Sequence, residues 1–265
     1  MKRPLEITGL GKSFVTPTGV YTAVQNFNMQ VEPGEFVCLL GHSGCGKSTV
    51  LSILAGLQRA SEGGFCIDGR EVDEPGVDRG VVFQSPSLLP WLTAAENVML
   101  AIEQGQPHLN RLEKKRQVRN FLDLTGVGDA HNILPAELSL GTQQRVAIAR
   151  ALSLNPRFLL LDEPFGMLDS LTRFELQDML LQVWETSRKT VVMVTHDVDE
   201  ALYLADRIVL MTDGPAARIG LILDVPFSRP RDRSRVLKHA DFYRLRARII
   251  DFLEKHANQF SDRAS

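Results

Sequence analysis

The chain has 265 residues, of which 44% are hydrophobic, enough to build one large domain or a domain with a subdomain. Its 30 basic and 32 acidic residues leave a net charge of −2, which argues against nucleic acid as a partner. Three cysteines, Cys38, Cys45 and Cys66, do not suggest a disulfide framework and suit a reducing cytosol.

The N-terminal stretch MKRPLEITGL carries basic residues but no apolar segment of signal-peptide length. No apolar run in the sequence approaches the ~18–20 residues that a membrane-spanning helix needs. If the protein works at a membrane, we therefore expect another chain to hold it there.

Short apolar or β-branched runs recur along the chain and predict the strands of a sheet. They are FVCLL at 36–40, VVF at 81–83, RFLLLDEP at 157–164, VVMVTH at 191–196 and RIVLM at 207–211. Continuous apolar runs of this length, separated by helical patterns, are typical of a parallel sheet buried on both faces. The sequence therefore predicts an α/β fold.

Two segments depart from this alternation. Between residues 88 and 136 the sequence is mostly polar with helical periodicity, and we predict a helical subdomain over about 88–155, inserted between two strands. It belongs to a main domain that we assign to residues 1–223. Residues 224–265 are predicted to form an extended basic linker and an amphipathic helix, whose arginines lie in solvent or face an anionic membrane surface.

The motif GHSGCGKST fits G-x-x-x-x-G-K-[ST] and lies between a predicted strand and a predicted helix, as this motif requires. Its glycines let backbone N–H groups wrap around a phosphate, and the next helix points its positive end at the same anion. Lys47 is predicted to reach the β- and γ-phosphates, and Ser48 to bind Mg²⁺. The predicted contact residues are Gly41, His42, Ser43, Gly44, Cys45, Gly46, Lys47, Ser48 and Thr49.

Two acidic residues follow the apolar run that ends at residue 161. Asp162 lies at the carboxyl end of a predicted strand, where ligands bind in such sheets, and is predicted to hold Mg²⁺ through water. Adjacent acids after an apolar strand are costly to bury without a cation, and Glu163 is then the natural general base for water attacking a γ-phosphate. His196 follows another strand and is predicted to contact the γ-phosphate.

A second anion-binding helix start is predicted within LSLGTQQRVAIARAL, at residues 138–152. Ser139 is predicted to cap a helix whose apolar face carries Val146, Ala149 and Leu152, which leaves free N–H groups in its first turn. One triphosphate does not need two such helix starts from one chain. We therefore predict a two-fold dimer, in which each chain's helix start closes over the nucleotide held by the other.

Together these motifs resemble the ATP-binding subunits of ABC transporters over nearly the whole chain. In the family's order they match Walker A at Gly41–Thr49, the Q-loop at Gln84, the signature LSLGTQQR, Walker B at FLLLDEP, the D-loop at Leu168–Asp169 and the switch histidine at His196. The resemblance implies a RecA-like P-loop core with a helical subdomain and a small antiparallel β-region. It also implies ATP hydrolysis, with ATP and Mg²⁺ bound.

The resemblance assigns further roles to individual residues. Phe14 matches the aromatic side chain that stacks on adenine, with Tyr21 as the alternative. Gln84 matches the residue that senses Mg²⁺ and the transmembrane partner. Ser139 and Gly141 resemble the signature contacts to the γ-phosphate, and Asp169 lies in the matching D-loop.

Leu140 departs from the family pattern, which usually has LSGGQ. A leucine still carries a backbone N–H, so the donor survives. What is lost is the freedom to adopt a positive φ, at ~1 kcal/mol or more if that conformation is required. We therefore expect a working site.

The transported ion is indicated only by resemblance. Residues 85–100, SPSLLPWLTAAENVML, resemble the nitrate, sulfonate and taurine importer group. The tail, with its GPAARIG turn and RPRDR segment, resembles ATPase subunits of nitrate, bicarbonate and cyanate importers, and we favour nitrate or nitrite.

The same resemblance implies the partners and the location. These are permease subunits, a second identical or paralogous ATPase subunit and, indirectly, a periplasmic or lipoprotein solute receptor, at the cytoplasmic face of the inner membrane. Trp91 and the pair Leu88–Leu89 match the region that receives the permease's coupling helix, with ordinary core packing as the alternative.

Two other classes fit the sequence less well. Soluble ABC ATPases of translation carry two nucleotide domains per chain, and those of DNA repair insert a long coiled coil; neither feature is found here. An unrelated P-loop kinase or GTPase would lack the signature helix, and a GTPase would show an N-K-x-D motif, which is not found.

Overall fold

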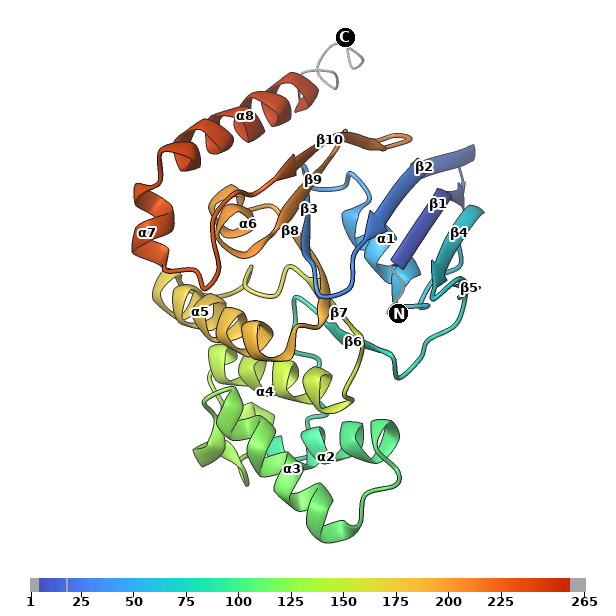
Figure 1. Cartoon of the computed structure of the whole chain (residues 1–265). Coiled ribbons are helices and arrows are strands. Elements are labelled where there is room, and N and C mark those ends of the chain that lie inside the picture. The colour runs from blue at the N-terminus through green and yellow to red at the C-terminus, as the bar shows by residue number, and fades with distance from the viewer. Residues whose placement is uncertain (1–4, 18, 258–265) are drawn as a thin grey trace. The chain divides into compact units, whose positions relative to one another are not determined.

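The computed structural model describes residues 5–17 and 19–257 (Figure 1). The chain forms two compact units. Unit 1 takes the chain up to residue 74 and from residue 192 onward, and unit 2 is Pro75–Val191. Residues 1–4 of the N-terminal stretch and residues 258–265 of the predicted C-terminal segment lie outside the described residues.

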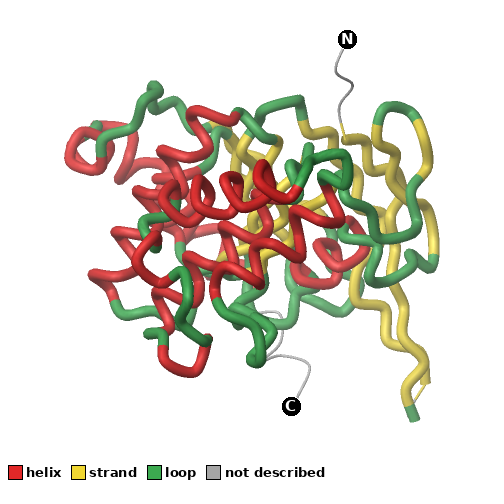
Figure 2. The backbone as a smooth tube through the Cα atoms, turned by 90° about the horizontal axis from the view of Figure 1, so that it is seen from below, coloured by secondary structure: helices red, strands yellow, loops and turns green. Residues whose placement is uncertain are grey.

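Unit 1 contains a four-stranded antiparallel sheet in the order β2-β1-β4-β5. Its strands are β1 (Leu5–Thr16), β2 (Gly19–Val31), β4 (Glu62–Ile67) and β5 (Arg70–Glu71). Phe27, Met29 and Val31 are buried and alternate with exposed residues, because successive side chains of a strand point to opposite faces. The hairpin of β1 and β2 is seen as two long adjacent yellow strands in Figure 2. This sheet is the small antiparallel β-region that the resemblance implied.

A second set of strands in unit 1 has the order β10-β9-β3-β8. The strands are β3 (Phe36–Leu40), β8 (Thr190–Thr195, which enters from unit 2), β9 (Arg207–Met211) and β10 (Ile219–Asp224). β3 is parallel to β9, and every residue of β3 and β8 is buried, as expected of strands covered on both faces. The helices of unit 1 are α1 (Lys47–Leu54), α6 (Val198–Leu204), α7 (Arg233–Lys238) and α8 (Ala240–Ala257).

Unit 2 combines two parallel strands with four helices. The strands are β6 (Arg79–Val82) and β7 (Phe158–Asp162), and the helices are α2 (Ala94–Gly105), α3 (Arg111–Leu124), α4 (Leu140–Ser153) and α5 (Ser170–Ser187). Thr93 and Asn110 begin α2 and α3 with complete capping boxes, since Glu96 and Glu113 bond back to their backbone N–H groups. The core shared by α2, α3 and α4 includes Ala94, Val98, Ile102, Val118, Leu122, Val146 and Ala149.

The predicted strands correspond to β3, β6, β7, β8 and β9, and the α/β fold class is confirmed. Two short 3₁₀ turns, Gly128–Ala130 and Pro135–Glu137, connect the helices of unit 2. Among the helices formed by residues 5–17 and 19–257, none has the length and apolar character to cross a membrane.

The basic segment after Asp224 differs from its prediction at two arginines. Arg231 is 8% exposed, and Arg229 donates to a carboxylate oxygen of Asp206 at 2.8 Å. The expectation that these side chains lie in solvent or face a membrane is therefore wrong. The sequence pattern does not link these arginines to Asp206, which lies more than 20 residues earlier and contacts both of them within unit 1.

Candidate functional site

The phosphate-binding motif forms the loop between β3 and α1, as predicted. Lys47, the first residue of α1, is 4% exposed. Its Nζ donates to the carbonyl oxygens of Gly41 and His42, each at 2.8 Å. These bonds hold the ammonium group against the backbone of its own loop. The cation is therefore positioned by residues 41–47 themselves.

Gly46 shows why this loop needs glycine. It has a φ of 91° at the N-cap of α1, a left-handed conformation that disfavours other residues. A Cβ at this position would lie 2.6 Å from Cγ2 of Val24 in β2. Strain and steric overlap would both act against any side chain here, so β2 can pack closely against the start of α1 only with glycine at 46.

The sequence interpretation missed one partner of the loop. Nδ1 of His42 lies 2.9 Å from Oδ1 of Asp213, a residue that follows β9. No sequence motif relates residues 42 and 213. The parallel pairing of β3 with β9 brings them together, because the carboxyl ends of parallel neighbours lie at the same edge of a sheet.

Cys45 fills a small buried position in the same loop and is 1% exposed. Burial raises the pKa of its thiol, which keeps the group neutral. A Cβ at Gly41 would lie 2.8 Å from the Cys45 sulfur. Cys45 therefore has a packing role in the loop.

The two aromatic residues predicted for adenine stacking are cross-strand partners. Phe14 of β1 lies directly opposite Tyr21 of β2, which places both side chains on one face of the antiparallel sheet. Phe14 is half-buried and Tyr21 is 41% exposed. Lys12 Nζ lies 5.2 Å from the Phe14 ring centroid. The structure thus presents both aromatic side chains together.

In unit 2, the acidic pair follows β7 and meets the predicted Q-loop residue. Asp162 ends β7 and Glu163 comes next, and both are half-buried. Glu163 has a φ of 44°, uncommon for a residue with a side chain, and its carbonyl oxygen accepts from Gly166 N at 3.0 Å. Nε2 of Gln84 lies 3.5 Å from Oε2 of Glu163. The structure therefore brings the predicted base and the predicted sensing residue together.

The second predicted helix start is present as α4. Ser139 is its N-cap, and its Oγ accepts a hydrogen bond from Thr142 N at 3.2 Å. The apolar face predicted from Val146, Ala149 and Leu152 is buried. Ser139 itself is exposed, whereas Gly141 is buried and Leu140 and Thr142 are half-buried.

Gly141 and the D-loop residue Asp169 both lie against Thr172 of α5. A Cβ at Gly141 would lie 2.5 Å from Cγ2 of Thr172, so glycine lets α4 approach α5. Asp169 caps α5 and accepts from the N–H groups of Leu171 and Thr172, each at 3.1 Å. The hydroxyl and N–H of Thr172 hold the pKa of Asp169 below its ordinary value. Sequence reasoning did not find Thr172, because no motif contains it.

Leu140 is the first residue of α4, which begins at this position. It is not among the residues with positive φ in the described part of the chain, so leucine carries none of the strain considered above. We expect Leu140→Gly to change the ATPase rate at saturating ATP by less than about tenfold, a barrier change under ~1.4 kcal/mol. An inactive wild type that gained full activity from this substitution would contradict the expectation.

His196 follows β8 and is exposed. The next residue, Asp197, caps α6 by accepting from the N–H groups of Asp199 and Glu200 at 2.9 and 3.1 Å. His196 therefore lies on a single connection between a buried strand and a short helix.

The three residues after Gln84 that were predicted to contact the permease have different environments. Leu88 packs against the core of α2, α3 and α4, which supports core packing for this residue. The backbone N–H of Leu89 donates to Asn97 Oδ1 at 2.9 Å. Trp91 is 70% exposed, which core packing does not explain.

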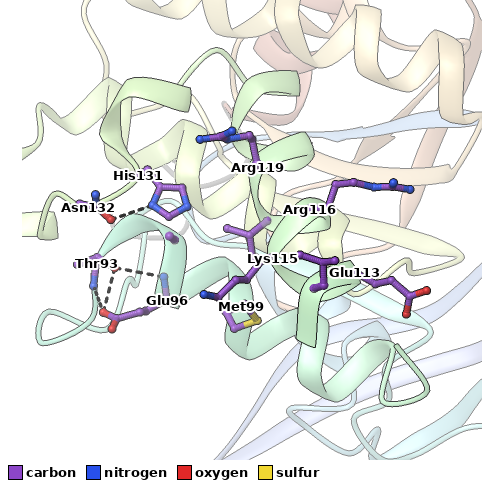
Figure 3. A pocket seen from close by; sticks show the side chains of 12 residues that line it. Thr93, Glu96, Met99, Glu113, Lys115, Arg116, Arg119, His131 and Asn132 are labelled. Carbon is purple, nitrogen blue, oxygen red and sulfur yellow. Dashed lines mark hydrogen bonds between the residues drawn. The ribbon is translucent and has the colours of Figure 1, made fainter. Parts of the chain in front are cut away.

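Unit 2 also has a pocket of about 740 Å³ between α2 and α3 (Figure 3). Met99, Leu112 and Val118 give it apolar walls. Lys115, Arg116, Arg119 and His131 supply basic groups, as Figure 3 shows. Glu96 also lines the pocket, but its carboxylate is bound to Thr93.

Known proteins resemble the chain in sequence. Residues 24–166, just over half of the chain, match the family model described as ABC transporter. The chain is 51% identical to the nitrate import ATP-binding protein NrtD of Synechococcus elongatus, over 92% of this chain and 89% of that protein. It is 50% identical to the bicarbonate transport ATP-binding protein CmpD of the same species, over 94% and 90%.

A solved structure also resembles the chain. It is a dimeric ATP-binding cassette in a post-hydrolysis state, bound to ADP and Pi, with 33% identity and a TM-score of 0.75. The match covers 84% of this chain and all of that one. The chain therefore belongs to the ABC transporter family, as one of its ATP-hydrolysing subunits.

Proposed function

We propose that this ATPase energises the import of a small inorganic anion, with nitrate or nitrite as the favoured substrate. The observation that carries this proposal is the 51% identity to a nitrate import ATP-binding protein over nearly the full length of both chains. Bicarbonate is the second candidate, because a bicarbonate transport ATP-binding protein is 50% identical. Both ions are small planar oxyanions that the permease and receptor would select.

ATP binding is assigned to residues of the phosphate loop and the antiparallel sheet. Phe14 stacks on adenine, with Tyr21 opposite it as the alternative. The N–H groups of residues 41–49 bind the phosphates, and Lys47 neutralises their charge. Support comes from the buried Lys47 ammonium, whose carbonyl partners hold it in the loop.

Mg²⁺ is assigned to the Ser48 hydroxyl, Asp162 and Gln84. Across the described residues, no group of three or more His, Cys, Asp and Glu side chains is arranged to hold a metal ion. Mg²⁺ commonly binds one or two protein oxygens together with phosphates and water. Ser48 is exposed at the start of α1, and Asp162 is half-buried at the end of β7. Bound there, the ion would neutralise charge that develops on the phosphates.

Hydrolysis is assigned to Glu163, with His196 as a contact to the γ-phosphate. As a carboxylate, Glu163 accepts a proton from the attacking water. The Gln84 amide beside it supports its orientation, at 3.5 Å. The two groups therefore have separate roles, since Glu163 moves the proton and His196 binds the terminal phosphate.

The active form is proposed to be a two-fold dimer with an identical or paralogous subunit. Ser139, Gly141 and Asp169 of one chain act on the nucleotide bound by the other. Support comes from the exposed Ser139 at the N-terminus of α4, since a helix start suits an anion. The related solved cassette is also dimeric.

The permease is proposed to contact unit 2 near Trp91, which would hold the chain at the cytoplasmic face of the inner membrane. The exposed indole supports Trp91 as part of an interface. The solute receptor would act through the permease and not through this chain.

Uptake in a deletion strain tests the proposal. Without the gene we expect labelled nitrate and nitrite uptake to fall to background, with bicarbonate uptake unchanged. Loss of bicarbonate uptake alone would move the assignment to the second candidate.

Complementation with Trp91→Ala is expected to lower uptake by about tenfold or more, because a central interface tryptophan often contributes strongly to binding. ATP binding by the isolated protein should be unchanged. Leu124→Ala is the matched control, since Leu124 is also exposed in unit 2 but lies at the end of α3. Full uptake with Trp91→Ala would show that the permease does not depend on Trp91.

A further inference from the structure

The helix that follows His196 is held at its first turn. Thr195 Oγ1 accepts from the N–H of Asp197 at 3.0 Å, so the connection through His196 is fixed at the end of β8. Asp197 then caps α6. Arg246 of α8 donates to Asp199, in the first turn of α6, at 2.7 Å. Both flanks of His196 are therefore tied to neighbouring structure.

The C-terminal end of α6 is held by two arginines of the tail. Arg231 Nη1 donates to the carbonyl oxygen of Tyr203 at 2.7 Å, and Arg229 Nη2 donates to that of Leu204 at 2.6 Å. The last carbonyls of a helix have no partner within it, and a cation there also interacts favourably with the helix dipole. Since α6 has only seven residues, these contacts lie at the opposite end of a short helix from His196.

Asp206 connects the same arginines to the strand before the phosphate loop. It accepts from Arg229 at 2.8 Å and lies 3.7 Å from Arg231. Its other carboxylate oxygen accepts from the N–H of Phe36, the first residue of β3, at 3.0 Å. One acid therefore joins the tail, the end of α6 and the start of β3.

The burial of the ion pairs between Asp206 and the two arginines indicates that these residues fix the position of α6. The Arg231 side chain is fully buried and Glu200 of α6 is 5% exposed. Buried ion pairs add little net stability over apolar side chains of similar size, but they fix geometry, since each charge needs its partner in place. The chain runs from β10 past α6 to α7 and α8, so the tail lies along the helix that it holds (Figure 1).

We propose that Arg229 and Arg231, with Arg246, are positioning residues for ATP hydrolysis, because they hold α6 and thereby set the position of His196. The inference rests on the proposed contact of His196 with the γ-phosphate. The arginines of the basic tail would then position His196 within their own chain.

A double-mutant cycle between Arg231→Met and His196→Ala tests this. We expect Arg231→Met to lower kcat by about tenfold with KM for ATP changed by less than about twofold, and to have no further effect when His196 is already alanine. A general loss of stability would lower kcat by the same factor in both backgrounds. Arg231→Lys should recover only part of the rate, because a lysine cannot make two forked hydrogen bonds.

Each outcome decides a separate point. If His196→Ala leaves kcat unchanged, the proposed role of His196 fails, and the inference fails with it. If His196→Ala lowers kcat but the two effects multiply, only the inference is overturned. If Arg231→Met does not fold, the same cycle is made with Arg229→Gln. The control is Arg244→Ala, since Arg244 pairs with Asp241 inside α8, and it should leave kcat unchanged.

Discussion

Glu163→Gln is expected to lower kcat for ATP hydrolysis by about a thousandfold, within the 10²–10⁴ range that a general base contributes. The amide has the shape of the carboxylate but cannot take a proton from water. It can still pair with the Gln84 amide, which lies 3.5 Å from the native carboxylate, and the backbone turn at residue 163 is kept. Binding of ATP should therefore remain within about twofold of the wild type.

The same variant should accumulate as a dimer on size-exclusion chromatography with ATP, because the closed dimer can no longer hydrolyse the nucleotide that holds it together. Glu103→Gln is the matched control, since Glu103 is an exposed acid in α2. It should turn over and elute like the wild type. Normal hydrolysis by Glu163→Gln would show that another group accepts the proton.

The strands and helix starts could be predicted because their signals are local. FVCLL becomes β3 with all five residues buried, and Ser139 caps α4 as its sequence position indicates. Both features depend on hydrophobic pattern and on hydrogen bonds within a few residues. The phosphate loop could be found for the same reason, since its motif and its flanking elements are contiguous.

Contacts between distant segments could not be predicted. His42 meets Asp213 only because β3 and β9 are parallel neighbours, and Gly141 is needed because Thr172 of another helix lies against it. Two arginines of the tail were the clearest error. A run of arginines is usually solvated, and the burial of Arg231 and half-burial of Arg229 depend on Asp206, which no local pattern links to either residue.

Lys47→Ala is expected to abolish ATP binding and hydrolysis in a protein that still folds. The ammonium group has the carbonyls of Gly41 and His42 as partners, and its removal takes away the positive charge proposed to neutralise the phosphates. Isothermal titration with ATP measures the binding, and thermal unfolding without nucleotide checks the fold. Lys47→Arg keeps the charge but not the compact ammonium, so its recovery of binding should be partial.

Mixing two inactive chains then tests whether one nucleotide is shared by two subunits. Ser139→Phe adds bulk at an exposed helix start, so it should block the partner's nucleotide without disturbing its own chain's phosphate loop. In a mixed dimer of the Ser139→Phe and Lys47→Ala chains, one nucleotide site contains both substitutions. The other site combines an unchanged phosphate loop with an unchanged helix start. Random pairing should restore about a quarter of wild-type hydrolysis when the two sites work independently.

If each chain closed over its own nucleotide, every site in the mixture would carry one defect. Native mass spectrometry that finds mixed dimers without any recovered activity would therefore contradict the shared site, because subunit exchange would have occurred and still produced no functional pair.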